Sequence, residues 1–257
     1  GNSSGNPYIS EKEWYGMYIA DKVVAVSETL KREIQWLYQV PDYKLEVIRN
    51  GVTPQKYRMQ IDPGRVKEKY GIHPLAPTVL FVGRITWQKG PDLLVDAIPH
   101  VLRNRWDTKF VIAGTGDMKG YIEWRVNQLG VSHAVRFPGF VDYFNYLELL
   151  NACDIMCIPS RNEPFGLVLL EAMSCGRPTV VTDVGGLSEM VENFVDGIKV
   201  YTYPESVAWG INYLLNNPNE MRKISENAYK KALKYTWDEP VEKLIKLYNE
   251  VTNNAIR

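Results

Sequence analysis

The sequence predicts an α/β protein built on a doubly wound parallel sheet. From residue 78 onward, short apolar runs alternate with segments of helical spacing six times, the pattern of strand–helix–strand units. The runs are apolar almost throughout, as expected for strands that are covered on both faces. The chain has 257 residues, 45% of them hydrophobic, which is enough for one large domain or two small ones.

Two short strands and a helix are expected before this alternation begins. Residues 22–26 form the first strand, and Ser27 is the N-cap of a helix that runs to about Tyr38. A second strand follows at 46–48 and is ended by the turn-forming pair Asn50-Gly51. Residues 53–77 are rich in proline, glycine and charge, with a short helix near 66–70, and are expected to be a linker.

The regular alternation defines the main sheet. Its strands are expected at 78–82, 109–113, 134–137, 155–158, 179–182 and 198–201, with helices between them. Several helices end the chain, at about 205–216, 219–234 and 239–253.

Charge and composition exclude several classes of protein. Thirty basic residues balance thirty acidic ones, which argues against bulk nucleic-acid binding. No apolar run approaches the roughly eighteen residues that a membrane-spanning helix needs, so no transmembrane segment is expected.

Cysteines and histidines give no sign of a metal site or a disulfide framework. The cysteines are odd in number and the histidines are scattered, so we expect buried free thiols, a reducing cytoplasmic location and no metal. These residues are Cys153, Cys157, Cys175, His73, His100 and His133.

Two glutamates bracket the start of a helix that follows the 155–158 strand. Pro164 stands at the entrance of the helix expected over 165–174, so Glu163 is expected in the loop at the strand's carboxyl end and Glu171 inside the helix. Ligands of open α/β sheets bind at that edge, where a helix N-terminus presents unpaired N–H groups to phosphate. Gly166 allows a ligand to approach the backbone closely.

A second polar loop follows the 78–82 strand directly. It contains Gly83, Arg84 and Lys89, which place a guanidinium and an ammonium in one strand-to-helix connection. A rigid fork of donors and a mobile point charge together suit a diphosphate. The alternative is a solvated loop with two ordinary surface cations.

The pattern around the glutamates resembles the E-x7-E signature of retaining nucleotide-sugar glycosyltransferases of the GT-B fold, in the group 1 (GT4, glycogen synthase-like) family. The string that carries it consists of Glu163, Pro164-Phe165-Gly166-Leu167, Glu171 and Gly185-Gly186-Leu187. The resemblance implies a Rossmann-like domain, the C-terminal half of a GT-B architecture ending in several helices. It covers nearly the whole chain but about the last two-thirds of the family's length.

The resemblance also implies a division of the chain. Residues 1–52 are then a remnant of the acceptor-side N-terminal domain with the hinge, 53–77 the linker, 78–236 the donor-binding domain and 237–257 a helix that crosses back. A truncated protein is therefore expected, one that binds donor but transfers sugar poorly.

Roles for the site residues follow from the same resemblance. Arg84 and Lys89 would grip the donor diphosphate, Glu163 the sugar hydroxyls and Glu171 the ribose. The backbone from Phe165 through Gly166 and Leu167 to Val168 would complete the phosphate cradle. The chain has no Asp-x-Asp, consistent with a scheme that needs neither metal nor cofactor.

Two further turns have two interpretations each. Gly114 and Gly116 follow the 109–113 strand and either lie by the nucleotide, as in the resembled family, or form a tight packing turn. Phe137 and Pro138 end the 134–137 strand and either sandwich a base or belong to the core. Glu189, near Gly185-Gly186, is expected to be a favourable first-turn acid without a catalytic role.

The predicted function is metal-independent, retaining transfer of a sugar from a nucleoside diphosphate (UDP- or ADP-glucose, or GDP-mannose) to a glycan or other hydroxyl acceptor. The sequence gives no indication of an oligomeric state. One alternative is a nucleotide-sugar-binding module without activity. A dehydrogenase is disfavoured because the strict Gly-x-Gly-x-x-Gly fingerprint is missing, since the third glycine falls one residue late at Gly120. A nucleotide-sugar 2-epimerase would lack the Glu-Pro-Phe-Gly string.

Overall fold

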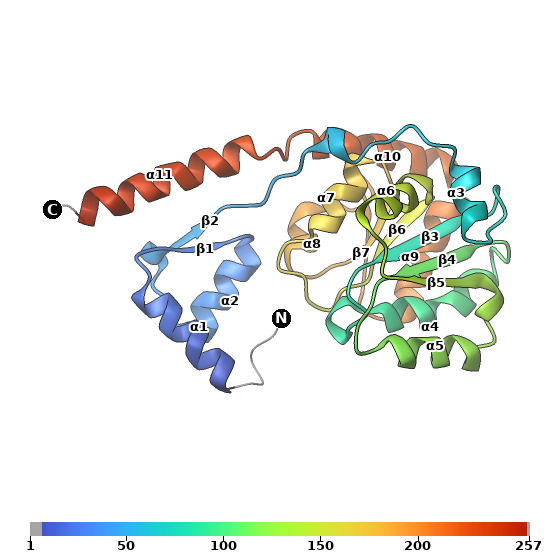
Figure 1. Ribbon diagram of the computed structural model, residues 1–257, viewed down its shortest axis with the longest axis horizontal. Coiled ribbons are helices and arrows are strands. Elements are labelled where there is room, and N and C mark those ends of the chain that lie inside the picture. Colours follow the sequence, from blue (N-terminus) through green and yellow to red (C-terminus); the bar gives the residue numbers. More distant parts are fainter. Residues whose placement is uncertain (1–6, 256–257) are drawn as a thin grey trace.

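Six parallel strands form the main sheet of the computed structural model, which describes residues 7–255 (Figure 1). The order across the sheet is β5-β4-β3-β6-β7-β8, which reverses direction between β3 and β6. This confirms the predicted doubly wound sheet. The strands are β3 (Thr78–Val82), β4 (Lys109–Ala113), β5 (Val135–Gly139), β6 (Ile155–Ile158), β7 (Thr179–Thr182) and β8 (Ile198–Val200).

Helices cover both faces of the sheet and create two separate cores (Figure 1). One face carries α4 (Pro91–Leu102), α5 (Lys119–Gln128) and α9 (Pro204–Asn216). The other face carries α6 (Tyr143–Ala152), α7 (Leu167–Ser174), α8 (Gly185–Met190) and α10 (Pro218–Ala232).

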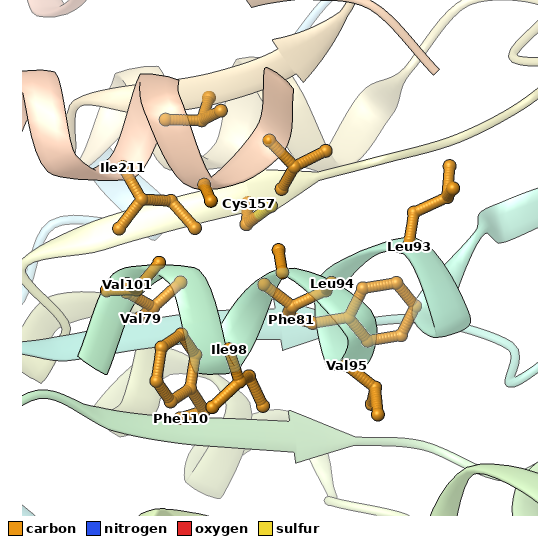
Figure 2. Packing of buried hydrophobic residues seen from close by; sticks show 14 of the residues in the cluster. Val79, Phe81, Leu93, Leu94, Val95, Ile98, Val101, Phe110, Cys157 and Ile211 are labelled. Carbon is orange, nitrogen blue, oxygen red and sulfur yellow. The ribbon is translucent and has the colours of Figure 1, made fainter. Parts of the chain in front are cut away.

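Alternation of side chains along the inner strands explains why their sequences are mostly apolar. In β3, Val79 and Phe81 enter the first core while Leu80 enters the second. Figure 2 shows the first core, in which Phe81 and Phe110 lie against α4 and Ile211 of α9 packs nearby. Both faces of the four inner strands, β4, β3, β6 and β7, are therefore buried, as the sequence predicted, whereas the outer strands β5 and β8 contribute side chains to the first core only.

The N-terminal residues form a small unit of their own. Its elements are α1 (Pro7–Ile19), β1 (Val23–Ala25), α2 (Glu28–Tyr38) and β2 (Leu45–Val47), and the two strands pair in parallel. Ser27 caps α2 as predicted, because its side chain accepts from the N–H of Leu30 at 3.1 Å. The sequence pattern did not predict α1, since the apolar residues of that helix lie on all sides of it rather than along one stripe.

The segment 53–77, expected to be a linker, also contributes to the main domain. It contains the short 3₁₀ helix η3 (Pro54–Lys56) and α3 (Pro63–Lys69), and Ile72 and Ala76 are buried in the second core. Lys67 forms an ion pair with Asp154 at 2.7 Å, which holds α3 beside the start of β6. This segment is therefore packed on the sheet as well as joining two units.

The last helix, α11 (Asp238–Ala255), leaves the main domain and extends in the direction of the N-terminal unit (Figure 1). Glu239, Pro240 and Lys243, near the start of α11, line a pocket together with Val47 of β2 and with Arg49. Within residues 7–255, no helix combines the length and the apolar character needed to cross a membrane. Residues 1–6 and 256–257 of the expected ranges 1–52 and 237–257 lie outside the described residues.

The three cysteines are buried and free, as predicted. Burial raises the pKa of Cys153 and of Cys175 to about 12 and that of Cys157 further. These thiols therefore stay protonated at neutral pH and pack as small apolar side chains.

Candidate active site

A pocket of about 390 Å³ opens at the carboxyl ends of β3 and β6. This is the point at which the strand order reverses, where open α/β sheets bind ligands. The pocket is lined by Val26, Asn50, Arg84, Gln88, Lys89, Glu163, Pro164, Phe165, Gly166, Leu167 and Val168. It therefore brings Arg84 and Lys89 of one loop together with Glu163, which lies 74 residues beyond Lys89.

Lys89 and Glu163 form the closest charged contact in this pocket. The Nζ of Lys89 lies 2.6 Å from the Oε2 of Glu163, and the Ser160 hydroxyl donates to the same oxygen at 3.1 Å. The Glu163 side chain is 10% exposed and that of Lys89 is 24% exposed. A buried carboxylate is thus held in one position by two donors, while Lys89 keeps further N–H donors for a ligand.

Arg84 lies at the more open side of the pocket. The side chain is exposed and donates to the Oε1 of Gln88 at 3.4 Å. The loop ends in the 3₁₀ helix η4 (Trp87–Lys89) and Gly90, whose φ is +64°. A Cβ at Gly90 would lie 2.0 Å from the carbonyl oxygen of Pro159, so only glycine lets this loop rest on the end of β6.

The N-terminus of α7 forms the floor of the pocket. The helix begins at Leu167 rather than at Phe165 as predicted, because Gly166 adopts a left-handed conformation with φ +100°. Phe165 is buried in the second core, so its side chain anchors the turn. The N–H groups of Leu167 and Val168, the first two of α7, have no partner within the helix and are available to an anion, whereas that of Leu169 donates to the carbonyl oxygen of Gly166 at 3.0 Å.

Gly185 and Gly186 support the Glu163 loop from below. The Gly186 N–H donates to the carbonyl oxygen of Glu163 at 2.8 Å. A Cβ at Gly185 would lie 2.2 Å from that oxygen, and one at Gly186 would lie 2.5 Å from the Cα of Phe165. These two glycines therefore let the start of α8 contact the backbone of the Glu163 loop directly. This contact fixes the position of Glu163 in the pocket.

Glu171 does not line this pocket but lies one turn further along α7. Its Oε1 accepts from the Tyr57 hydroxyl at 3.0 Å, and its Oε2 accepts from the Tyr146 hydroxyl. Burial, followed by the charge of Glu171, raises the pKa of both tyrosines, so both remain donors. Each carboxylate oxygen has a second lone pair that a ribose hydroxyl can use.

Gly83, Gly114, Phe137 and Pro138 are also outside the pocket lining. Gly114 has φ +138°, and a Cβ there would lie 1.8 Å from the carbonyl oxygen of Gly83. This packing accounts for a glycine in the tight turn. Phe137 packs against the first core. A contact of these residues with a nucleotide stays a prediction.

The sequence did not single out three residues that organise the site. Tyr57, directly after η3, and Tyr146 of α6 donate to Glu171, and Arg161 ties the loop before Glu163 to Asp92 of α4. Arg161 binds Asp92 through two contacts of 2.8 and 2.6 Å, and its guanidinium lies 4.9 Å from the ring centre of Trp87. Their partners lie 69 or more residues away, except Tyr146, which is 25 residues from Glu171, so spacing gave no signal.

Among the described residues, no group of three or more His, Cys, Asp or Glu side chains could hold a metal ion. The groups at hand are two cations, one buried carboxylate and a helix N-terminus. Such a set can bind a polyanion and orient a neutral polar group beside it.

Comparison with known proteins places this site in a family. The family described as "Glycosyl transferases group 1" matches residues 64–231. The chain is 38% identical over 251 residues to an uncharacterized glycosyltransferase of Methanocaldococcus jannaschii, which covers 96% of this chain and 64% of that protein. It is 32% identical over 251 residues to the alpha-D-kanosaminyltransferase of Streptomyces kanamyceticus, with the same coverage of 96% and 64%.

Solved structures agree on the fold. The Anabaena protein HepE, in complex with UDP and glucose, aligns with a TM-score of 0.83 at 23% identity, covering 95% of this chain and 66% of HepE. The C-terminal domain of a group 1 glycosyl transferase, LpcC of Francisella tularensis, aligns with a TM-score of 0.65 at 25% identity, covering 72% of this chain and 97% of that domain. These likenesses show a Rossmann-like domain of the GT-B architecture.

The chain spans about 64% of the length of the two relatives named above. The match of the family over residues 64–231 includes both charged loops and the whole main sheet. The chain therefore belongs to the group 1 glycosyl transferases.

Proposed function

We propose that this chain binds the donor of a sugar-transfer reaction, a nucleoside diphosphate sugar, and that the protein transfers the sugar to a hydroxyl group of a glycan or other acceptor. The observation that carries the proposal is the meeting of Arg84, Lys89, Glu163 and the N-terminus of α7 in one pocket at the switch point of the sheet. Each of these groups suits one part of such a donor.

The diphosphate would lie over the α7 N-terminus, between Arg84 and Lys89. As the bond from the anomeric carbon to the diphosphate oxygen breaks, negative charge develops on the leaving group, and these two cations stabilise that charge. Two side-chain cations and a helix N-terminus supply this stabilisation without a metal ion. Glu163, which Lys89 and Ser160 hold, would accept from the sugar hydroxyls.

Glu171 would receive the ribose, beside the tyrosines that already donate to it. The titles of the HepE structures name UDP and UDP-glucose. We therefore propose a UDP-sugar donor first, with ADP- and GDP-sugars as competitors. The same proposal includes transfer with retention of the sugar's configuration. It also includes a cytoplasmic location, which agrees with the three free buried thiols.

A thermal-shift panel of UDP-glucose, UDP-N-acetylglucosamine, ADP-glucose and GDP-mannose tests the proposal. A ligand that binds only the folded protein at a hundred times its Kd stabilises it by about 2.7 kcal/mol, so one member should raise Tm clearly. The shift should persist in EDTA, since no metal holds the diphosphate. If all four sugars leave Tm unchanged at millimolar concentration, the donor assignment is wrong; if EDTA removes the shift, metal independence is wrong.

A further inference from the structure

The side-chain carboxylate of Glu189, on α8, accepts four hydrogen bonds from the N-terminal part of the chain. Its Oε1 accepts from the N–H of Thr29 at 2.6 Å and from the Thr29 hydroxyl at 2.7 Å. Its Oε2 accepts from the N–H of Glu28 at 3.1 Å and from the Arg49 guanidinium at 3.2 Å. The carboxylate therefore joins two segments that lie 140 to 161 residues away in the sequence.

These hydrogen bonds serve both partners: they provide donors for the buried carboxylate and an acceptor for the free N–H groups at the start of a helix. The N–H groups of Glu28 and Thr29 open α2 and have no partner inside that helix. Ser27 of the same segment takes the next N–H, that of Leu30. A carboxylate at this end is also favoured by the helix dipole. Glu189 thus caps a helix of the other unit, not the first turn of its own helix as the sequence suggested.

The partners of Glu189 stand next to two residues of the donor pocket. Val26 lies just before the capped segment, and Asn50 directly follows Arg49; both line the pocket opposite the charged loops. Glu189 itself is not part of the lining. On its own side, α8 begins at the two glycines that support the Glu163 loop.

Burial alone would raise the pKa of Glu189, but the hydrogen bonds from Thr29, Glu28 and Arg49 outweigh it and hold the pKa below its ordinary value. The side chain is only 16% exposed. Glu189 is therefore a charged, largely buried group at neutral pH whose partners all belong to the N-terminal unit.

We propose that Glu189 is a positioning residue that holds the N-terminal segment where Val26 and Asn50 close the donor pocket. The proposal rests on the proposed function of that pocket. Because the carboxylate grips both segments next to these residues, its loss would let the N-terminal wall move away from a donor that the main domain still binds through Arg84 and Lys89.

Glu189→Gln tests this role, with Glu192→Gln as the matched control. Glutamine keeps the size but has one acceptor oxygen, so one of the two pairs of contacts must fail. Glu192 lies three residues later and is exposed, so its substitution removes the same charge without touching the N-terminal segment. Both variants are titrated with UDP and with the nucleotide sugar that the panel selects, at a temperature where each is folded.

We expect Glu189→Gln to weaken nucleotide-sugar binding by at least about fivefold, the lower end of common coupling between sites, and Glu192→Gln to leave it unchanged. Amide exchange at residues 28 and 29 should become faster in Glu189→Gln alone, a change that a loss of general stability would not confine to this segment. If Glu189→Gln does not fold, Thr29→Val removes one donor to the same carboxylate and should give a smaller weakening in the same direction.

The outcomes separate two claims. If the unaltered chain binds no nucleotide sugar, the proposed function fails and the positioning role fails with it. If the unaltered chain binds and the affinity of Glu189→Gln is unchanged, or that of Thr29→Val where Glu189→Gln does not fold, only the positioning role is overturned.

Discussion

Replacing Arg84 and Lys89 together with alanine is expected to weaken UDP or ADP binding at least tenfold, about 1.4 kcal/mol. Both side chains line the pocket at the switch point, and each charge-assisted hydrogen bond to phosphate contributes roughly 1.5–3 kcal/mol. Isothermal titration of the unaltered and the double variant measures the change directly. Unchanged titration curves would remove the diphosphate assignment.

The two single variants separate binding from stability. Lys89→Ala removes the 2.6 Å partner of Glu163 and leaves the Ser160 hydroxyl on the same carboxylate oxygen. Because the pair is only partly buried, the loss of stability should fall below the roughly 3–5 kcal/mol that breaking a fully buried pair costs. Arg84 has one weak side-chain contact, at 3.4 Å, so Arg84→Ala should lower affinity without lowering Tm. Arg222→Ala with Lys230→Ala removes two exposed cations of α10 and serves as the control for net charge.

Gly186→Ala is expected to destabilise the fold by about 1–3 kcal/mol and to weaken donor binding in the same variant. Its Cβ would lie 2.5 Å from the Cα of Phe165, so the backbone of the Glu163 loop has to move. Denaturant unfolding gives the change in free energy, and titration with UDP gives the change in affinity.

Gly120→Ala is the matched control for this substitution. A Cβ at Gly120 would meet nothing within 4 Å, and the residue lies in α5, where alanine favours helix by up to about 1 kcal/mol. If Gly186→Ala has the same stability and affinity as the unaltered chain, the Glu163 loop does not depend on the close contact between Gly186 and Phe165.

The sheet was predictable because its four inner strands are buried on both faces and therefore mostly apolar. The residues of β3 divide between two cores, and the same pattern marks β4, β6 and β7. The ends of the elements were harder to predict from the sequence. Helix α7 begins two residues later than predicted because Gly166 adopts a left-handed conformation that a sequence pattern does not reveal. Helix α1 has no apolar stripe, so nothing in its sequence indicated a helix.

The charged part of the site followed from topology. Arg84 and Lys89 follow β3, Glu163 follows β6, and parallel strands that neighbour each other bring these loops together. The supporting contacts did not follow, because they depend on tertiary packing. Tyr57 reaches Glu171 across 114 residues, and Glu189 reaches Thr29 across 160, distances at which spacing carries no information.

A crystal structure of this chain with the nucleotide sugar selected by the thermal-shift panel tests the central claim most directly. We expect the diphosphate within hydrogen-bond distance of Arg84, of Lys89 and of the first N–H groups of α7, with the sugar beside Glu163. A nucleotide bound elsewhere on the sheet, or a diphosphate that touches neither cation, would contradict this account of the pocket.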